Sequence, residues 1–427
     1  MKPASMTPAR LPLLVAALTL LPFVWCHAHF ARLFYFQDEL DLLDWRDRLG
    51  FFPWMGRMFA ENFVPLFKLT WGGAIELFHG SYFALIMLVW LNHALNTALL
   101  ARLLTTIGLS TPAAFFAAMI FGVSSLNLET LAWAVQWSAV QSITFLLLGL
   151  LVIVRSPRVD SASARFWLML FALFSPLCFS RGVLTGPVLA GALLILEDKL
   201  NLNPTRLLTA ACALLPSIGV GLLVTVNATG NHQHLGGHGA DIASFAFHYF
   251  SGSPLHQLFV GKPMSVEAGY YWVTAKLLIM GAAVLLAHGR LRVVLVALAA
   301  FDLSNALLLG VGRYHTGLSA ALSSRYQYTA LLCLLPFCAS LLDQVVNATG
   351  QNKPRLASMA CWVAACFAII WASQDWPKSM RAWQSWRGAS LRAALAHPTD
   401  KAAPNFSGVP WISNERTREL VEKYTLH

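Results

Sequence analysis

Long apolar runs recur along most of the chain, and they constrain its fold more than any other feature. Residues 82–101, 136–154 and 292–311 are clear examples. A helix of about 20 residues spans the hydrocarbon core of a bilayer, which is about 30 Å thick. Backbone groups in lipid must be hydrogen-bonded within the structure, which excludes open-edged sheets. The runs therefore predict an all-α polytopic membrane protein.

The composition agrees with this fold class. Of the 427 residues, 57% are hydrophobic and 12% are charged, whereas a soluble domain carries about 25% charged residues. The mean hydropathy of +0.59 places most of the chain in lipid. The seven cysteines lie in or beside the apolar runs without a metal-type spacing. We interpret them as small core residues without a disulfide framework.

We expect about eleven transmembrane helices. Their approximate ranges are 11–30, 82–101, 112–124, 136–154, 165–179, 183–197, 207–227, 271–289, 292–311, 325–343 and 356–373. The run Leu11–Phe30 is interpreted as a retained span because it is long and lacks a small-residue cleavage site. Residues 1–373 would form the transmembrane domain, with outer loops at 31–81 and 228–270. The tail 374–427 is rich in Trp and Arg, which prefer the headgroup region, so we expect an amphipathic helix along the outer surface.

Basic residues fall on one face of this topology. The N-terminus and the loops on that face carry Lys2, Arg10, Arg102, Arg155, Arg158, Arg165, Lys199, Arg206, Arg290, Arg292, Lys353 and Arg355. Cations in short loops mark the cytoplasmic side, which also accounts for the net charge of +10 without invoking nucleic acid. The unusual polar residues are expected together on the opposite, outer face.

The first outer loop contains two segments of helical character. Leu42, Trp45 and Leu49 recur at helical spacing with charges between them, which predicts an amphipathic helix in the membrane interface. Pro53 is expected to end this helix. Residues 65–79 are apolar but too short to span, so they predict a second interfacial or re-entrant helix.

Two adjacent carboxylates, Asp38 and Glu39, stand where the first span leaves the membrane. Such a pair suits a base that activates an acceptor, or a divalent cation site. Alternatively, both are solvated loop acids, or they favour the N-terminus of the next helix. Asp41 and Asp44 are expected to be such solvated acids or acids that favour the helix N-terminus.

A third acid, Glu129, lies between two spans in the otherwise apolar segment SSLNLETLAW. Such an acid is expected to face a polar cavity, together with Asn127 and Trp133. Alternatively, Glu129 belongs to the N-terminal turn of a helix. Trp133 and Trp137 share one helical face, a placement more typical of interface anchors than of a sugar platform.

Three arginines, Arg181, Arg313 and Arg325, are expected at span ends on the outer side, with Lys262 and Tyr326 nearby. Together they would clamp a donor phosphate, for which the planar guanidinium is well suited. The alternative for any one arginine is that it snorkels from a span end to the headgroups.

The loop NATGNHQHLGGHGAD contains His232, His234 and His238 at a spacing that allows a metal site. No cysteine accompanies them, and glycine-rich loops with histidine are common without a metal. We therefore expect none here. The weak alternative is a set made of Asp38, Glu39, His232 and His234.

Several segments together resemble a known family. They are the acidic pair after the first span, then ENFVPLFKLTW, LVWLNHALNTALLARLL and AAFFAAMIFGVSSLNLETLAWAVQW. This order resembles the membrane half of GT-C glycosyltransferases, which take sugars from polyprenyl-phosphate carriers. The resemblance covers residues 30–155, and the later LSSRYQYTALL resembles a Ser-Arg-Tyr element of many bacterial members.

The resemblance implies an inverting glycosyltransferase in a bacterial inner (plasma) membrane, with its active site facing the periplasm. Asp38 matches the acidic residue of the family's first outer loop and would deprotonate or orient the acceptor hydroxyl, with Glu39 as its partner. Arg313 or Arg325 would hold the donor phosphate. The acceptor would be a glycan, a lipid or a protein such as a pilin. A divalent cation, Mg²⁺ or Mn²⁺, is the one possible cofactor.

The chain departs from the family at one element. Members often carry a histidine before the Pro-Leu pair, whereas here Asn62, Phe63 and Val64 precede Pro65. We expect Asn62 instead to line the substrate cavity, together with His93 from the second span.

A glycolipid transporter or flippase is the alternative function. Such a protein needs charged or polar groups near the centres of its spans. Asp302 and Asn305 are the main candidates in this sequence. The charges otherwise cluster at one membrane face, which favours chemistry at the surface over passage through the membrane.

Overall fold

The computed structural model describes residues 10–156, 159, 161–196, 202–227, 237–260, 264–350, 366–387 and 407–427. All regular secondary structure within these ranges is helical, and one β-bridge joins Phe59 to Asn62. The expected all-α class is confirmed to that extent. Lys262, His232 and His234 lie outside these ranges, as does most of the expected span 356–373.

In the part of the chain that the structure describes, six helices are long and apolar enough to cross a membrane. They are α7 (Tyr82–Thr106), η2 with α10 (Ala134–Arg155), α13 (Pro204–Asn227), α16 (Val266–Leu286), α17 with η5 (Gly289–Thr316) and α18 (Ser324–Gly350). A seventh arises if α8 (Thr111–Val123) and the segment Ser125–Leu131, which contains η1 (Ser125–Asn127) and α9 (Leu128–Leu131), form one span bent by 43°.

The expected eleven spans are not confirmed, because three of the apolar segments form short helices. These are Leu11–Trp25, which contains α1 (Leu11–Thr19) and α2 (Leu21–Trp25), then α11 (Ala162–Cys178), and Ser180–Leu194, which contains η3 (Ser180–Leu184) and α12 (Thr185–Leu194). The longest of them has 17 residues. At about 1.5 Å per residue it reaches about 25 Å, less than the hydrocarbon core of about 30 Å.

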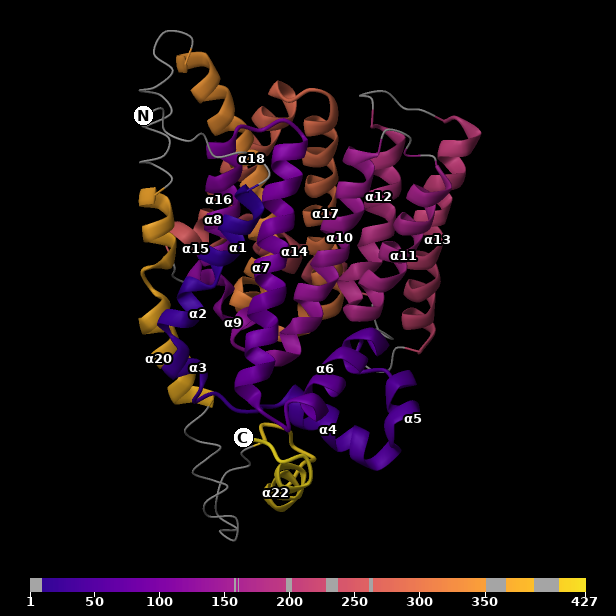
Figure 1. Cartoon of the computed structure of the whole chain (residues 1–427), viewed down its shortest axis with the longest axis vertical. Helices are drawn as coiled ribbons and strands as arrows, with labels where there is room; N and C mark the ends of the chain where they lie inside the picture. The colour runs from indigo at the N-terminus through magenta and orange to yellow at the C-terminus, as the bar shows by residue number, and fades with distance from the viewer. Residues whose placement is uncertain are drawn as a thin grey trace.

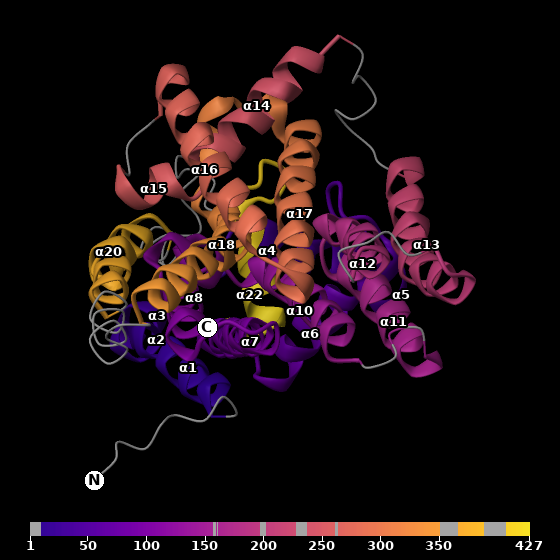
Figure 2. The same ribbon diagram turned by 90° about the horizontal axis from the view of Figure 1, so that it is seen from above.

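The long helices stand side by side, and the helices of the first loop gather at one end of the bundle (Figure 1). That end holds α4 (Asp38–Leu49), α5 (Phe51–Gly56), α6 (Pro65–Leu77) and the C-terminal α22 (Asn414–Lys423). Seen from above, α11, α12 and α13 form one group, while α14 (Gly239–Gly252), α16 and α17 form another (Figure 2). Segments from both groups contribute to the cavity described below.

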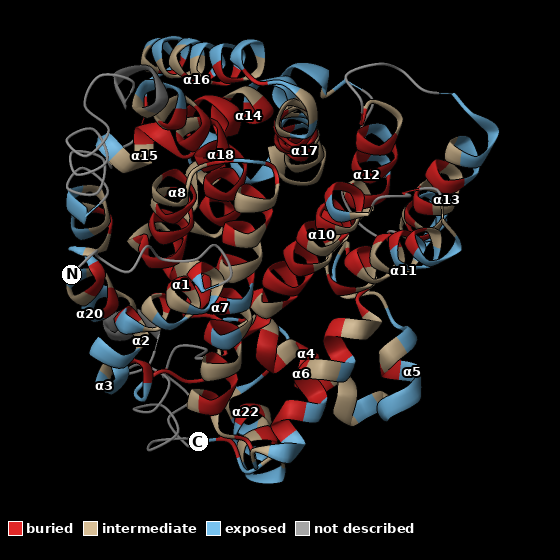
Figure 3. Ribbon diagram, turned by 45° about the horizontal axis from the view of Figure 1, so that its top comes forward, coloured by how far each residue is buried: buried red, intermediate tan, exposed pale blue. Residues whose placement is uncertain are grey.

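The outward faces of several long helices are apolar and exposed. Figure 3 shows exposed residues on the outer sides of α13 and α16, and buried residues between the helices. On α13 the exposed large apolar residues are Leu207, Leu208, Leu215, Ile218, Leu222, Leu223 and Val226. Such a surface is unusual for a soluble monomer, but it is what lipid contact requires. The helices therefore fit a membrane protein.

The first loop forms the two expected helices with one difference. Residues 65–77 form α6 as predicted, but Pro53 does not end the preceding helix. Instead, α4 ends at Leu49 because Gly50 adopts a φ of 74°, a conformation that glycine tolerates best. Pro53 lies inside the short helix α5, within its first turn, where its missing N–H costs little.

The two described parts of the tail have different placements. Helix α20 (Trp376–Arg387) lies beside α3 (His27–Phe30), and the fully buried Trp376 donates from Nε1 to the Val123 carbonyl oxygen (2.6 Å). Helix α22 packs on α4 instead. The tail thus returns to the end of the bundle that carries the first loop.

Candidate functional site

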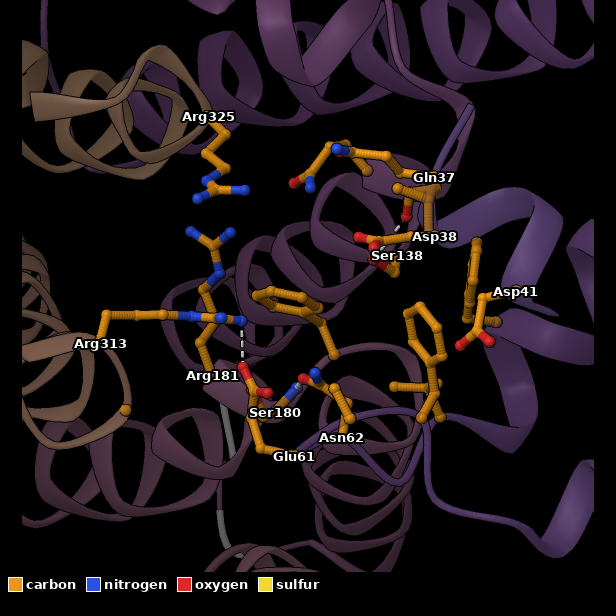
Figure 4. A pocket seen from close by; sticks show the side chains of 18 of the residues that line it. Gln37, Asp38, Asp41, Glu61, Asn62, Ser138, Ser180, Arg181, Arg313 and Arg325 are labelled. Carbon is orange, nitrogen blue, oxygen red and sulfur yellow. Dashed lines mark hydrogen bonds and ion pairs between the residues drawn. The ribbon is translucent and has the colours of Figure 1, made fainter. Parts of the chain in front are cut away.

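A cavity of about 930 Å³ opens where the first loop meets the long helices. The first loop contributes the start of α4 and the segment that precedes α6, and the tail contributes residues 408–411. The bundle contributes the η2 and η3 turns, the C-terminal parts of α13 and α17, and the start of α18. Charged side chains project into it from several of these elements (Figure 4). Charged residues that the sequence analysis expected on the outer face therefore surround one open cavity.

Asp38 projects into this cavity from the first residue of α4. The preceding residue, Gln37, has a φ of 45°, and its N–H donates to the Ser407 carbonyl oxygen (3.0 Å). Burial raises the pKa of Asp38, while the positive charges of Arg325 and Arg313 oppose this rise. Among the described residues, no donor or ion-pair partner occupies the Asp38 carboxylate, so it can accept a proton from a ligand.

Glu39 has a different environment from its neighbour and does not line the cavity. It is fully buried and accepts from the Phe36 N–H (2.9 Å), the Val135 N–H (3.0 Å) and the Tyr82 hydroxyl (3.1 Å). These bonds join the first turn of α4 to η2 (Ala134–Gln136) and α7. Glu39 therefore supports the turn that presents Asp38, rather than facing a ligand beside it.

The other acids of α4 hold the tail. Asp41 lines the cavity and accepts from Nε1 of Trp411 (2.9 Å), and burial raises its pKa. Asp44 was expected to be solvated or to favour the N-terminus of the helix. Instead it lies beyond the first turn of α4, its side chain is only 1% exposed, and it pairs with Arg48 (2.8 Å) and Arg416 (2.7 Å). The acids that cluster in the sequence are thus divided among several structural roles.

The three predicted arginines reach the cavity on the side facing Asp38 and Asp41 (Figure 4). They come from η3, from the end of α17 and from the start of α18. Arg313 forms an ion pair with Glu61, another residue of the cavity wall. Tyr326 lies next to Arg325 and also lines the cavity.

Arg181 is the most unusual of these cations. It is 4% exposed, its Nη1 donates to Thr329 Oγ1, and its Nε is buried without a hydrogen-bond partner. Within the described ranges no carboxylate pairs with it. The next residue is glycine because the turn packs tightly, since a Cβ at Gly182 would lie 2.2 Å from the Ser175 carbonyl carbon. Burying a cation without a counter-charge destabilises the folded protein, because the charge loses its hydration, and a bound anionic ligand would offset this loss.

The remaining predicted cavity residues divide into two sets. Asn62 and Trp133 line the cavity, and Asn62 Oδ1 accepts from the Ser180 N–H (3.2 Å). Asn127, Glu129 and His93 do not line it. This second set forms structural contacts at the ends and inside of the bundle.

Glu129 caps α18. Its Oε2 accepts from the Ser323 and Ser324 hydroxyls (2.9 and 2.8 Å) and from the Arg325 N–H (3.1 Å). A carboxylate at a helix N-terminus is stabilised by the unpaired N–H groups there. Glu129 thereby fixes the turn that carries Arg325, although it belongs to another segment.

Asn127 and His93 are buried in the bundle. Asn127 Nδ2 donates to the Phe121 carbonyl oxygen (2.7 Å). The two ring nitrogens of His93 lie 3.1 Å from the Tyr328 hydroxyl and 3.0 Å from the Gly122 carbonyl oxygen. Both residues tie α8 to its neighbours and do not reach a ligand.

The donor set for a divalent cation does not assemble in the described residues. No three His, Cys, Asp or Glu side chains gather there in a group able to hold a metal. Asp38 faces the cavity, whereas Glu39 is occupied by its three donors, and His232 and His234 lie outside the described ranges. We therefore derive no catalytic step through Mg²⁺ or Mn²⁺.

Sequence reasoning missed Arg57, and the structure shows how it is held. Its guanidinium lies over the Trp45 ring at 3.3 Å, and it lines the cavity. Lys68 of α6 donates to the carbonyl oxygens of Trp54 (2.7 Å) and Arg57 (2.6 Å), which fixes this part of the loop. Burial lowers the pKa of Lys68 to about 8. A single arginine in a loop carries no signal that would have identified it.

The tail residues of the cavity wall were also missed. They are Gly408, Val409, Pro410 and Trp411. Their segment, SGVPWISNE, has neither the hydropathy nor the charge pattern of a site, and it meets α4 only through the fold. The sole signal was the preference of tryptophan for polar–apolar boundaries.

No protein-family model matches the chain, and no curated protein matches its sequence. The site must be interpreted from its own chemistry.

Proposed function

We propose that this protein is a membrane glycosyltransferase that moves a sugar from a polyprenyl-phosphate donor to an acceptor on the periplasmic side of a bacterial inner membrane. One observation carries the proposal. A carboxylate without a partner, Asp38, and a buried arginine without a counter-charge, Arg181, face the same cavity among the described residues. A base on one side and a phosphate-binding cation on the other are what this transfer requires.

The cavity suits a single displacement with inversion. Asp38 takes the proton of an acceptor hydroxyl, whose oxygen attacks the anomeric carbon of the donor sugar. The bond between that carbon and the phosphate oxygen breaks, and polyprenyl phosphate leaves with its electron pair. Arg181 and Arg325 stabilise the negative charge that develops on the leaving phosphate. The raised pKa of Asp38 makes its carboxylate a stronger base than an exposed aspartate.

The wall of the cavity also suits the lipid part of the donor. Val224 of α13 and Leu308 and Leu309 of α17 line the cavity beside the arginines. These helices present other apolar side chains to the surroundings, among them Leu222 and Leu307. A prenyl chain can therefore lie along α13 and α17 while its phosphate meets Arg181.

The experiment that tests the proposal uses purified protein in liposomes with a panel of polyprenyl-phosphate sugars. Release of polyprenyl phosphate is measured with and without a mixture of acceptors. We expect slow release without acceptor from one donor, because water can replace the acceptor hydroxyl. If no donor on a panel of the common bacterial sugars is cleaved, the proposal is wrong.

A glycolipid transporter is the second candidate, and one buried ion pair favours it. Lys276 of α16 and Asp302 of α17 lie 2.6 Å apart, and each side chain is 1% exposed. Tyr249 joins this pair to Asn305, which lines the cavity. Charges inside spans often mark transport pathways. Movement of intact lipid between leaflets without cleavage, in the same liposomes, would support this function.

A further inference from the structure

One side of the cavity wall is supplied by the tail, and it lies away from the arginines. Residues 408–411 form this part, and the Ser407 carbonyl oxygen accepts from the Gln37 N–H beside Asp38. Ser407 Oγ bonds within its own segment, to the carbonyl oxygens of Val409 (3.0 Å) and Ile412 (3.1 Å). The segment is therefore an ordered part of the cavity wall, and it is attached to the turn that carries Asp38.

Trp411 is exposed and yet fixed in position. Its side chain is 63% exposed, and Nε1 donates to Asp41 Oδ1 (2.9 Å). The helix that follows is anchored by Arg416, which reaches Asp44 and Asp47 (2.7 Å each). In the described part of the chain no aromatic ring or cation stacks on the Trp411 ring. An indole that is held by its edge in this way leaves a face available to a ligand.

The charges around this wall differ from those at the arginine side. Asp38 and Asp41 are the carboxylates here, and Arg57 is the nearby cation, stacked on Trp45. The Asp41 carboxylate accepts hydrogen bonds from the side chains of Trp411 and Trp45, and a carboxylate has about four lone-pair sites, so capacity remains for hydroxyl donors. The charge of Arg57 opposes that of Asp41, and the charges of Arg325 and Arg313 oppose that of Asp38, so this wall has no excess positive charge for a second anion. The complementary ligand is therefore neutral and rich in hydroxyl groups.

We propose that Asp41, Arg57 and Trp411 form a subsite for a neutral carbohydrate ring of the acceptor, with the indole of Trp411 as its platform. This inference rests on the proposed transferase, since it assigns the acceptor to one side of the cavity and the donor phosphate to the other. Asp41 and Arg57 bind ring hydroxyls, and Asp38 lies next to the hydroxyl that reacts. Trp411 is then a specificity-determining residue, contributed by the tail.

The test measures binding of three neutral trisaccharides, maltotriose, cellotriose and chitotriose, to the purified full-length protein by saturation-transfer NMR titration. We expect at least one trisaccharide to bind. Trp411→Ala should weaken that binding about tenfold, and Trp411→Phe, which keeps a ring but loses the bond to Asp41, about threefold. The matched control is Trp25→Ala, because Trp25 is equally exposed (64%) but lies on α2, outside the cavity, and binding should be unchanged.

Several results would overturn the subsite. They are failure of all three trisaccharides to bind, an equal loss in Trp25→Ala, or unchanged binding in Trp411→Ala. Should Trp411→Ala not fold, Trp411→Phe and Asp41→Asn decide the question, since the first keeps an aromatic ring and the second keeps the volume of the side chain.

Donor cleavage is measured on the same samples, which separates this inference from the proposed function. A protein that cleaves a polyprenyl-phosphate sugar but binds no trisaccharide overturns the subsite alone. A protein that binds a trisaccharide through Trp411 but cleaves no donor overturns the transferase and the acceptor role of the subsite, and leaves a sugar-binding site.

Discussion

The two sides of the cavity are built in different ways. Arg181 and Arg325 extend from turns that are packed into the bundle, and Arg181 has no described carboxylate partner. Asp38 and Asp41 extend from a short helix that is held in place by the tail. The cationic side thus keeps positive charge available for a ligand. On the acidic side most carboxylates are bonded within the protein, which leaves Asp38 for chemistry.

The most severe test of this comparison removes Asp38, the acid of the cavity wall for which the described residues supply no hydrogen-bond donor or ion-pair partner. Asp38→Asn should lower kcat/KM for sugar transfer by about 10²–10⁴-fold, the usual contribution of a positioned general base. The amide keeps the shape of the side chain but cannot take the proton. Radiolabelled sugar transfer measures the effect. Asp241→Asn is the matched control, because Asp241 of α14 is 64% exposed and lies outside the cavity wall, and this variant should transfer sugar normally.

The pH dependence of the same assay sharpens this prediction. The pKa of Asp38 is raised, and the carboxylate must be deprotonated to act as the base. Transfer should therefore decline as the pH falls through a value above the ordinary aspartate pKa of about 3.9. A profile that is flat down to that ordinary value would contradict the assignment of Asp38.

A large loss of transfer is also expected on the cationic side of the cavity, but without a loss of thermal stability. Arg181→Met should reduce transfer by about 10²-fold, because a buried donor to the leaving phosphate is lost. The melting temperature without ligand should not fall, since the variant removes a buried charge that has no counter-charge. Arg313→Met is the contrast, because it leaves Glu61 unpaired and should lower the melting temperature. Parallel losses of stability in both variants would show that Arg181 is structural.

A smaller effect is expected where the tail joins α4. Arg416→Ala breaks ion pairs with Asp44 and Asp47 and should destabilise the protein by about 1–3 kcal/mol in denaturant unfolding. Asp44 keeps Arg48, which limits the loss. Arg418→Ala, whose partner Glu422 is exposed, should change stability by about 0.5 kcal/mol or less. Equal effects in the two variants would mean that the tail is not held by this pairing.

The smallest effect is a dependence of stability on pH at Asp47. Burial tends to raise its pKa, but hydrogen bonds and charge from Lys423 and Arg416 lower it overall. A lowered folded-state pKa contributes stability above the unfolded pKa of about 3.9, and that stability is lost as the pH falls through the folded value. Asp47→Asn should therefore reduce the melting temperature near pH 7, and the reduction should become smaller as the pH is lowered from about 3.9 toward 3. An equal reduction at both values would exclude the charge as the cause.

The sequence predicted much of the fold because hydropathy acts along the chain. Helices α7, α10 and α17 fall where the apolar runs place them. The number of spans was not predictable, because a run such as Leu11–Trp25 reads as one apolar segment although it breaks at Leu20. Apolar content alone does not distinguish a short buried helix from a helix that crosses the membrane.

The expected membrane topology predicted which candidate residues share one face, but it did not predict the role of each residue. Because successive loops lie alternately on the two faces of the membrane, the sequence predicted Asp38 and Arg325 on the same face. The structure brings both residues to one cavity. Nothing in the sequence separates Asp38 from Glu39, because adjacent positions on a helix point in different directions only after the helix is placed. The contact between Trp411 and Asp41 was equally hidden, since it joins positions 370 apart.

That long separation has a consequence for how the protein is made. Asp44 and Arg416 are 372 positions apart, so α4 emerges during synthesis long before its partner. Until then Asp44 and Asp47 stay without the tail's cations, and the nascent cavity lacks the wall that contains Trp411. A protein cut short before this point would insert most of its helices yet hold an unfinished pocket. A segment translated 370 positions after Asp41 therefore completes the wall of the candidate site.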